Sequence, residues 1–278
     1  MSSKSAPSPA PAAPPAPAAP APSTPGTDAL AERAISSIRR GMTVGLGTGR
    51  AAARCIRALA ARSQREKLDL TCVATSIASA ELATSLGLRV VDLAEVARLD
   101  FLFDGADEVA PDLAMIKGGG GAMTREKLAA AMARAGASHD TRGDSAQPRC
   151  VYCIDNTKLV PYLGVKYPLP LEVLPGAVGF VLGMLEDYGM TATRRADKQD
   201  AARPYVTDNG HAVLDVKLDL PALEEDGFDL LDLVVLLDST PGVVDHGIFM
   251  DEADLVLVET PKGVTEMTRP DPGAQDDE

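Results

Sequence analysis

One stretch of the sequence limits what this chain can fold into more than any other. Residues 101–103 form an apolar run that fits a strand buried on both faces. The run is followed by a turn rich in carboxylates, and then by Lys117 and the four glycines 118–121. A helix is expected from Thr124, with Glu126 in its first turn. Acids at a strand end, a lysine and bare backbone N–H groups before a helix predict a site that moves protons and holds anions.

Strands alternate with helices through the first 160 residues. The sequence predicts strands at residues 42–46, 70–74, 89–93, 99–103 and 150–154, and helices at 30–38, 51–61, 80–86 and from Thr124, the last with an apolar face of Leu128, Met132 and Ala135. This order predicts βαβ units, and hence an α/β fold with a Rossmann-like parallel sheet flanked by helices. Ligands of such sheets bind beyond the carboxyl ends of the strands, where the acids and glycines fall.

The pattern changes after Pro170. The expected order is a strand, a helix, two strands, a helix and a last strand, at 171–174, 177–188, 191–195, 213–218, 221–237 and from Val243. This β-α-β-β-α-β order is that of a ferredoxin-like unit. The apolar segment 253–259 is predicted to return to the first sheet. We therefore expect a catalytic α/β domain of residues 28–170 and 248–270, with a smaller α+β domain, residues 171–247, inserted in it.

Composition narrows the choice of partners. The 278 residues carry a formal net charge of −13, so neither nucleic acid nor an anionic membrane is an expected partner. No apolar run reaches the roughly 18 residues that a membrane span needs. Residues 1–27, rich in Pro and Ala, and the acidic residues 271–278 are expected to be disordered tails. Since the first tail lacks the apolar region of a secretion signal, a cytoplasmic protein is expected.

Neither the cysteines nor the histidines indicate a metal site. Cys150 and Cys153 have the spacing of a redox motif, but they lie in a strand, where residues three apart point to opposite faces. Ordinary core cysteines are therefore expected. The histidines, at positions 139, 211 and 246, are too dispersed for a metal site or a catalytic triad.

A second glycine-rich loop, residues 45–50, follows the first strand. Its three glycines invite a dinucleotide-binding interpretation, but the dinucleotide fingerprint places its third glycine one residue later than Gly49, where Arg50 stands. A loop for a smaller phosphate or a sugar hydroxyl fits better, because Thr48 and the free N–H groups face the same sheet edge. Dinucleotide binding is kept as the second interpretation.

Several longer motifs follow one another in an order that is specific to one family. They are Val44-Gly-Leu-Gly-Thr-Gly, Phe103-Asp-Gly-Ala-Asp-Glu-Val, Ile116-Lys-Gly-Gly-Gly, Thr124-Arg-Glu-Lys, Asp155-x-x-Lys, Tyr167-Pro-Leu-Pro-Leu-Glu-Val, Val206-Thr-Asp-Asn-Gly and Pro241-Gly-Val-Val. Together they resemble type A ribose-5-phosphate isomerase, from about Ala29 to Val264. The resemblance implies the interconversion of ribose 5-phosphate and ribulose 5-phosphate, in the non-oxidative branch of the pentose phosphate pathway, without metal or cofactor.

The resemblance also implies roles for individual residues. Glu126 matches the base that lifts the proton from C2 and returns it to C1 through an enediolate. A carboxylate with its ordinary pKa of about 4.3 is a weak base, so the site must stabilise the oxyanion or raise that pKa. Lys117 and the N–H groups of Gly118 to Gly120 match the oxyanion and hydroxyl contacts. Asp104 and Asp107 match the acids that open the sugar ring and move protons among hydroxyls.

Substrate binding is implied for Lys158 and for the two loops, namely Thr48, Gly49, Arg50, Ala51, Asp104, Gly105, Ala106, Asp107, Lys117, Gly118, Gly119 and Gly120. The chain departs from the family at the phosphate end, which is the part of the site that binds the substrate's phosphate. There Arg50-Ala51 replaces the usual Ser-Thr, and a lysine that is usual near Thr27 is absent. Arg50 is expected either to bind the phosphate or to plug the pocket. Residues 138–149 are expected to form an exposed loop that is longer than usual.

Other functions stay open. A non-catalytic sugar-phosphate sensor on the same fold would be expected to lose Glu126 or Asp104, and neither is lost. An isomerase of a different phosphorylated sugar is a further alternative, because the acids are intact and the phosphate end is altered. A relative of the acyl-CoA transferases would need a nucleophilic glutamate on another loop, for which there is no motif. The family's dimers and tetramers imply a homodimer or homotetramer.

Overall fold

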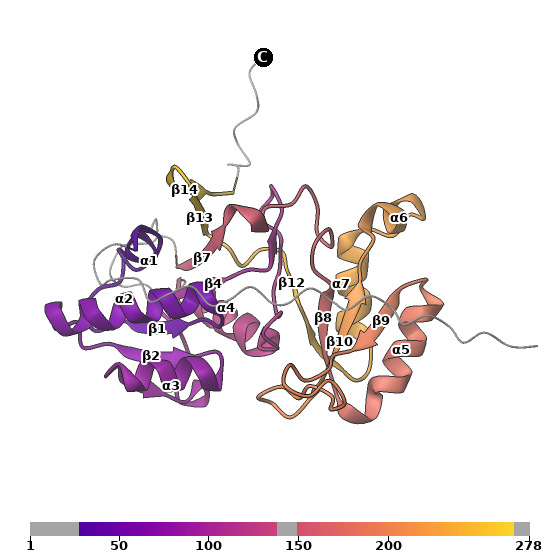
Figure 1. Cartoon of the computed structure of the whole chain (residues 1–278), viewed down its shortest axis with the longest axis horizontal. Coiled ribbons are helices and arrows are strands. Elements are labelled where there is room, and N and C mark those ends of the chain that lie inside the picture. Colours follow the sequence, from indigo (N-terminus) through magenta and orange to yellow (C-terminus); the bar gives the residue numbers. More distant parts are fainter. Residues whose placement is uncertain (1–27, 138–148, 270–278) are drawn as a thin grey trace, which may run out of the picture.

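A computed structural model describes residues 28–137 and 149–269 of the chain (Figure 1). The two predicted tails and most of the predicted 138–149 loop lie outside the described residues. None of the helices within these two ranges is long and apolar enough to cross a membrane. The described chain forms a seven-stranded sheet with its helices at one end of the molecule and a four-stranded sheet with its helices at the other (Figure 1).

The seven-stranded sheet has the order β14-β13-β7-β4-β1-β2-β3. Its strands are β1 (Thr43–Leu46), β2 (Thr71–Ala74), β3 (Val90–Val91), β4 (Phe101–Gly105), β7 (Cys150–Asp155), β13 (Leu255–Thr260) and β14 (Gly263–Met267). All pairings are parallel except that of β13 with β14. The Rossmann-like parallel sheet is confirmed, and β13 returns to it as predicted. The predicted strand at 89–93 is shorter, because a 3-10 turn, η1 (Leu93–Glu95), begins at an Asp92 cap.

Helices cover both faces of this sheet. They are α1 (Ala29–Ala34), α2 (Arg50–Glu66), α3 (Ile77–Ser85) and α4 (Met123–Ala137). Side chains alternate along each strand: Phe101 and Phe103 pack with α1, α2 and α3, whereas Leu102 packs with α4 on the opposite face. The predicted 30–38 helix is too long, since its α-helical part ends at Ala34.

The buried face of α4 was predicted wrongly. Leu128 is 48% exposed and Ala135 is exposed as well, whereas Ala129, Ala130 and Ala133 are fully buried beside Met132. The alanines allow the helix to approach the strands closely. Because α4 contacts β4 and β7 on one side and β8 and β11 on the other, it lies between the two sheets and its buried surface is not one simple stripe.

The four-stranded sheet is antiparallel, with the order β11-β8-β10-β9. Its elements are β8 (Leu169–Val173), α5 (Val178–Asp187), β9 (Thr191–Arg194), β10 (Ala212–Lys217), α6 (Leu220–Glu225), α7 (Leu230–Ser239) and β11 (Val243–His246). The helices pack on one face of the sheet. The single helix predicted at 221–237 is wrong: it is interrupted at Gly227, which has a φ of +79°, and α7 starts anew at an Asp229 capping box.

Short elements complete the chain. A small three-stranded sheet consists of β5 (Glu108–Val109), β6 (Met115–Ile116) and β12 (Ile248–Phe249). Its strand β6 ends at Ile116, just before Lys117 and the glycine segment. The 3-10 turns η2 (Asn156–Lys158) and η3 (Pro175–Ala177) follow β7 and β8. The four cysteines are free and buried, as predicted. The Sγ atoms of Cys153 and of Cys55 in α2 lie 3.9 Å apart.

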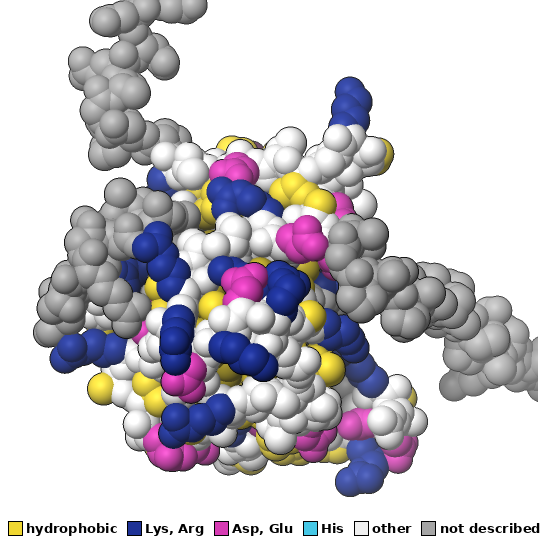
Figure 2. Space-filling view, turned by 90° about the vertical axis from the view of Figure 1, so that its left-hand side faces the viewer, with side chains coloured by type: hydrophobic (Ala, Val, Ile, Leu, Met, Phe, Trp, Pro, Cys, Tyr) yellow, Lys and Arg dark blue, Asp and Glu magenta, His cyan; other side chains and the backbone are white. Residues whose placement is uncertain are grey.

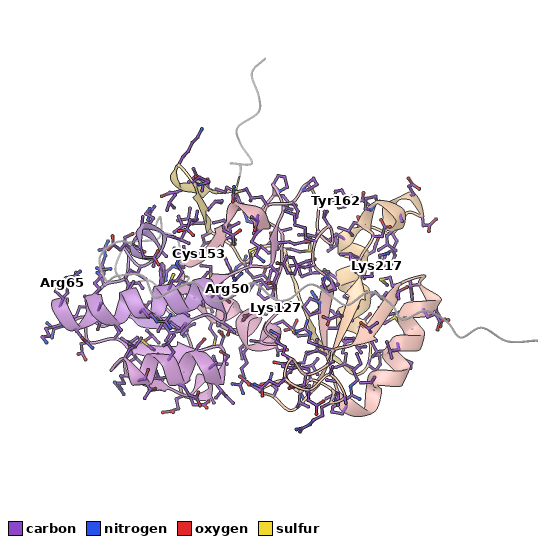
Figure 3. All side chains as sticks on the ribbon, in the orientation of Figure 1. Arg50, Arg65, Lys127, Cys153, Tyr162 and Lys217 are labelled. Carbon is purple, nitrogen blue, oxygen red and sulfur yellow. The ribbon has the colours of Figure 1, made fainter. Side chains whose placement is uncertain are left out.

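Positive charge is concentrated on α2 although the chain as a whole is acidic. The helix carries five arginines and a single acid, Glu66. Figure 2 shows the end of the molecule on which α2 and α3 lie, where lysine and arginine side chains are spread with acids between them. Several of these charges are paired, as in the 2.9 Å contact of Arg62 with Glu66. Figure 3 places Arg65 at the outer end of α2 and Arg50 at its inner end, near the middle of the molecule.

Candidate active site

A cavity of about 280 Å³ opens beyond the carboxyl ends of β1, β4 and β7. Every residue that the sequence predicted for the site, except Asp104, lines it. The loop after β1, the loop after β4 and the segment before α4 supply most of the wall, and the end of β7 with η2 supplies the rest. The sequence missed the remaining lining residues, which are Leu30, Arg54, Cys153, Ile154 and Asp155.

Lys117 is a buried ammonium held between two carboxylates. Its Nζ lies 2.8 Å from Asp104 Oδ2 and 3.3 Å from Glu126 Oε2, and it donates a hydrogen bond to the carbonyl of Gly105. The rings of Tyr152 and Phe249 flank it, with centroids 5.4 and 5.5 Å away. Burial would lower the pKa of Lys117, but Asp104 and Glu126 raise that pKa above its usual value, so the side chain stays charged.

Asp104 is fixed behind Lys117. Its Oδ1 accepts hydrogen bonds from the N–H groups of Thr48, at 2.9 Å, and Gly105, at 2.7 Å. A Cβ on Gly47 would lie 2.1 Å from this oxygen, so the loop after β1 needs glycine there to pass the carboxylate. Burial raises the pKa of Asp104, and Lys117 opposes the rise. Asp104 is thus the buried counter-charge that fixes the ammonium.

Glu126 has the chemical properties of a base. It is 4% exposed, and among the described residues none makes a directed hydrogen bond to its Oε2, although that atom faces Lys117. Burial, and next the charge of Asp104, raise the pKa of Glu126 to about 8, whereas Lys117 lowers it. A carboxylate with such a pKa in the wall of the cavity can take up and return a proton near neutral pH.

The glycine segment 118–121 forms the wall opposite the loop after β1. The N–H of Gly119 donates to Asp107 Oδ2 at 2.8 Å, and the N–H of Gly121 closes a turn onto the carbonyl of Gly118. Within the described ranges, the N–H groups of Gly118 and Gly120 donate to no other protein group. Of the three predicted donors, two are therefore available to a ligand and the third holds Asp107.

Glu108 does not belong to this acid cluster, although it follows Asp107 directly. It is fully buried and turned away, where it accepts hydrogen bonds from the backbone N–H groups of Gly164, Lys166 and Tyr167. Its role is to hold the segment that leads into β8. Among the described residues there is no cluster of three or more His, Cys, Asp or Glu side chains that could hold a metal ion.

Positive groups gather at the end of the cavity formed by α2 and η2. Gly49, with a φ of +97°, caps α2 without a side-chain hydrogen bond, and the first turn of α2 contains no acid. Arg50 follows it, is exposed, and forms no hydrogen bond or ion pair with another described residue. Lys158 donates to the hydroxyl of Tyr167 at 2.5 Å. A helix N-terminus with an arginine and a lysine beside it is suited to a phosphate.

Asp155 is the acid on this side of the cavity. Burial would raise its pKa, but hydrogen bonds from Thr157 and the charges of Lys158 and Arg50 lower it. Arg54, one turn further along α2, is paired with Asp28 and Glu259 and so belongs to the framework of the molecule. Of the arginines at this end, it is therefore Arg50 that can turn to a ligand.

The first turn of α4 is tied to the antiparallel sheet on both sides of Glu126. Thr124 donates to Glu172 of β8, and Arg125 donates to Asn209 at 2.7 Å. Lys127 pairs with Asp245 at 2.6 Å and donates to the carbonyl of His246 at 2.8 Å. These ties fix the helical turn that carries Glu126.

Glu172 is the centre of this attachment, and the sequence analysis did not identify it. It is fully buried and accepts hydrogen bonds from Thr124, Thr207, Asn209 and His211. Because a carboxylate can only accept, Nδ1 of His211 carries a proton. The sequence signal was available, since an acid stands in an otherwise apolar strand.

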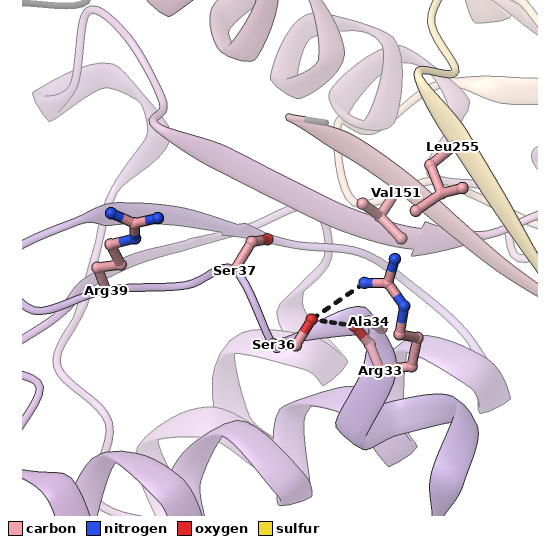
Figure 4. A pocket seen from close by; sticks show the side chains of 7 residues that line it. All are labelled: Arg33, Ala34, Ser36, Ser37, Arg39, Val151 and Leu255. Atoms are coloured by element: carbon pink, nitrogen blue, oxygen red, sulfur yellow. Dashed lines mark hydrogen bonds between the residues drawn. The ribbon is translucent and has the colours of Figure 1, made fainter. Parts of the chain in front are cut away.

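A second cavity, of about 230 Å³, lies at the opposite ends of the strands (Figure 4). Val151 and Leu255, at the starts of β7 and β13, form its floor, and Arg33, Ala34, Ser36, Ser37 and Arg39 line the rest. Ser36 accepts a hydrogen bond from the guanidinium of Arg33 and donates one to its carbonyl. Among the described residues that line it there is no carboxylate, whereas Asp107, Glu126 and Asp155 line the first cavity.

The fold and the first cavity are those of an enzyme that transfers protons on a small anionic substrate. Comparison with known proteins identifies the family. Residues 71–138 and 142–263 match the family model of ribose 5-phosphate isomerase A (phosphoriboisomerase A). A protein of Thermococcus kodakarensis named Ribose-5-phosphate isomerase A is 42% identical over 243 residues, which is 87% of this chain and 96% of the relative. The chain belongs to the ribose 5-phosphate isomerase A family.

Solved structures agree with this assignment. The ribose 5-phosphate isomerase A of Methanocaldococcus jannaschii is 36% identical, with a TM-score of 0.75 over 86% of this chain and 96% of that one. A D-ribose-5-phosphate isomerase in complex with phospho-erythronic acid is 33% identical, with a TM-score of 0.73 over the same shares of the two chains.

Proposed function

We propose that this protein interconverts ribose 5-phosphate and ribulose 5-phosphate, with Glu126 as the base. The observation that carries the proposal is the Glu126 carboxylate, which is buried in the wall of the cavity, has a raised pKa and lies 3.3 Å from the charged Lys117. The family assignment supports the substrate, since the relatives bear the name of this isomerase.

Proton transfer follows from the geometry around Glu126. The carboxylate takes the proton from C2 of the open-chain aldose, and electrons move onto the O1 oxygen to form an enediolate. Lys117 and the N–H groups of Gly118 and Gly120 stabilise the negative charge. The O2 hydroxyl gives its proton to O1, and Glu126 returns its own proton to C1, which leaves the ketose. A lysine fixed by Asp104 offers its charge without rearrangement.

Asp107 and Asp104 serve the sugar ring and its hydroxyls differently. Asp107 lines the cavity and is aimed by the N–H of Gly119, so it can take the proton of the C1 hydroxyl and pass it to the ring oxygen as the bond from C1 to that oxygen breaks. Asp104 is 1% exposed, and both of its oxygens face protein donors. Its contribution reaches the substrate through Lys117.

The phosphate end is formed by Thr48, Gly49, Arg50 and Lys158. The α2 N-terminus offers N–H groups, and Arg50 offers a guanidinium in place of the two hydroxyls that the family usually carries. Ala51 leaves room for the phosphate, and Gly105 and Ala106 line the sugar between the two ends. The cavity volume, about 280 Å³, is near the lower limit of roughly 300 Å³ for ligand pockets, which suits a five-carbon sugar phosphate.

We also propose a cytoplasmic homodimer or homotetramer in which residues 171–247 form an inserted domain. Exposed apolar side chains support an interface on the second sheet's helices, where Phe180 of α5 and Leu231 and Val235 of α7 are each more than half exposed. Light scattering of the purified protein measures the oligomeric state directly.

The deciding experiment is an assay of the purified protein with ribose 5-phosphate. We expect ribulose 5-phosphate to form, and in D₂O we expect deuterium to enter the transferred position. A protein that binds ribose 5-phosphate without turnover would be a sensor. Faster turnover of another aldose phosphate, such as arabinose 5-phosphate, would make that sugar the substrate.

A further inference from the structure

The carbonyl groups of the glycine segment are held from the antiparallel sheet. Arg195, which follows β9, donates from Nη1 to the carbonyl of Gly118 at 3.0 Å and to that of Gly119 at 3.3 Å. Tyr205 donates from its hydroxyl to the carbonyl of Gly120 at 2.9 Å. In Figure 1 the segment between β9 and β10 extends from the second sheet toward the half of the molecule that carries α4.

Arg195 is itself fixed. Its guanidinium forms a two-pronged ion pair with Asp215 of β10, with Nε 2.9 Å from Oδ2 and Nη2 bonded to Oδ1. The ring of Tyr205 lies 5.8 Å from its guanidinium carbon. A pair of this geometry leaves Nη1 aimed at the two glycine carbonyls.

The peptide groups between Gly118 and Gly120 connect Arg195 to the cavity. In a trans peptide the C=O of one residue and the N–H of the next point in opposite directions. The carbonyl of Gly118 therefore orients the N–H of Gly119, which holds Asp107, and the carbonyl of Gly119 orients the N–H of Gly120, which faces the cavity. A charged donor on a carbonyl also polarises the peptide and strengthens its N–H as a donor.

We propose that Arg195, fixed by Asp215, is a positioning residue that orients the N–H groups of Gly119 and Gly120 toward Asp107 and the reacting oxygen. The proposal rests on the proposed isomerase function and adds a residue of the second sheet to it. Tyr205 has a lesser part, because the carbonyl of Gly120 is joined to the N–H of Gly121, which is already bonded to Gly118. Its ring also fits against Gly121, where a Cβ would lie 2.3 Å from the hydroxyl.

Kinetics separate positioning from a merely structural tie between the two halves of the molecule. Arg195→Met should lower kcat by roughly tenfold to a hundredfold with little change in KM, because donors to a developing oxyanion act in the transition state. Tyr205→Phe should lower kcat by less than Arg195→Met does. Arg194→Met, which removes an exposed arginine one residue away, should change neither constant.

Inhibitor binding is the second measurement. Phospho-erythronic acid has a planar, negatively charged carboxylate that resembles the enediolate. Ribitol 5-phosphate has no carboxylate and is uncharged at that end of the molecule. Arg195→Met should weaken binding of the first by about the factor by which kcat/KM falls and leave binding of the second unchanged. Asp215→Asn, which keeps Arg195 but loosens it, should give an intermediate result in both measurements.

The outcomes distinguish the two proposals. If the wild-type protein does not isomerise ribose 5-phosphate, the proposed function fails before any variant is compared. If the wild type is active and Arg195→Met has an unchanged kcat with a lower melting temperature, Arg195 is a structural tie and the inference is wrong. A higher KM at unchanged kcat would also overturn it. Should Arg195→Met not fold, Arg195→Lys decides, because it keeps the charge but loses the two-pronged pair with Asp215 that aims Nη1 at the two carbonyls.

Discussion

The carboxylate of Glu126 lies 3.3 Å from the ammonium of Lys117, and the carboxylate of Asp104 lies 2.8 Å from the same ammonium. One positive charge is thus shared by two buried carboxylates. Asp104 accepts additional hydrogen bonds from two backbone N–H groups, whereas among the described residues no backbone N–H donates to the Glu126 carboxylate. The proton of the group is therefore most easily held by Glu126, which is the one of the two carboxylates that lines the cavity.

Glu126→Gln tests the base directly. The amide keeps the size of the side chain but cannot accept a proton, so kcat should fall by at least about a hundredfold while KM changes little. Turnover of ribose 5-phosphate measures the effect, with Glu225→Gln, an exposed glutamate of α6, as the matched control. If the variant still exchanged the C2 proton with solvent at the wild-type rate, another group would be the base.

The pH dependence of activity follows from the raised pKa. Burial, with Asp104, holds the pKa of Glu126 at about 8, and only the ionised carboxylate can act as a base. We therefore expect kcat/KM to rise with pH through neutrality and to level off above about pH 8. The measured midpoint belongs to Glu126, Asp104 and Lys117 as a coupled group. A profile already flat at pH 6 would contradict this prediction.

The same pKa predicts how stability changes with pH. In the unfolded chain Glu126 loses its proton near pH 4.5, whereas in the folded protein it keeps the proton up to about pH 8. The folded state binds more protons between these values, so its stabilisation is complete below pH 4.5 and is lost as pH rises through 8. Glu126→Gln, which is neutral throughout, should gain melting temperature relative to the wild type from pH 5 to pH 9. A difference that stays constant over this range would refute the raised pKa.

Much of this site could be predicted from the sequence because its chemistry lies in short segments. Asp104 and Lys117 are 13 residues apart and Glu126 follows nine later, in a strand–loop–helix unit whose geometry is local. Glu108 shows the limit of such reasoning. It stands next to Asp107 in the carboxylate-rich turn, but the alternation of a strand turns it to the other side, where it accepts hydrogen bonds from three backbone N–H groups.

The contacts that fix the site could not be predicted in this way. Arg195 meets Gly118 across 77 residues, and Thr124 meets Glu172 across 48, so each pairing depends on how the second sheet packs against α4. The same packing explains the error at Leu128, because a helix between two sheets buries small residues on two sides. The break between α6 and α7 had a local signal, Asp226-Gly227, within a run that otherwise reads as one helix.

Catalysis should not depend on a metal ion. Lys117 and the backbone N–H groups already supply the positive field that a divalent cation would give to an enediolate. Dialysis against EDTA should therefore leave the rate with ribose 5-phosphate unchanged. A loss of activity that Mg²⁺ restores would show that carboxylates of the cavity bind a cation during turnover.

Glu172 should contribute strongly to stability. Glu172→Gln replaces one acceptor oxygen by a donor that faces the donors of Thr124, Thr207, Asn209 and His211. The free energy of unfolding should fall by about 1–3 kcal/mol. Urea denaturation measures it, with the exposed Glu186→Gln of α5 as control. Equal stability of the two variants would mean that the hydrogen bonds around Glu172 are not formed in solution.

Arg50→Ala tests the proposed phosphate site. A charge-assisted contact is worth roughly 1.5–3 kcal/mol and acts far from the reacting carbons, equally in the ground state and the transition state. Arg50→Ala should therefore raise KM for ribose 5-phosphate by one to two orders of magnitude and leave kcat nearly unchanged. Free ribose, which has no phosphate, is the control substrate and should be unaffected. Replacing Arg50-Ala51 by Ser-Thr should recover part of the lost affinity. Faster turnover of ribose 5-phosphate by Arg50→Ala would instead show that the guanidinium plugs the cavity and that the natural substrate is a different sugar phosphate.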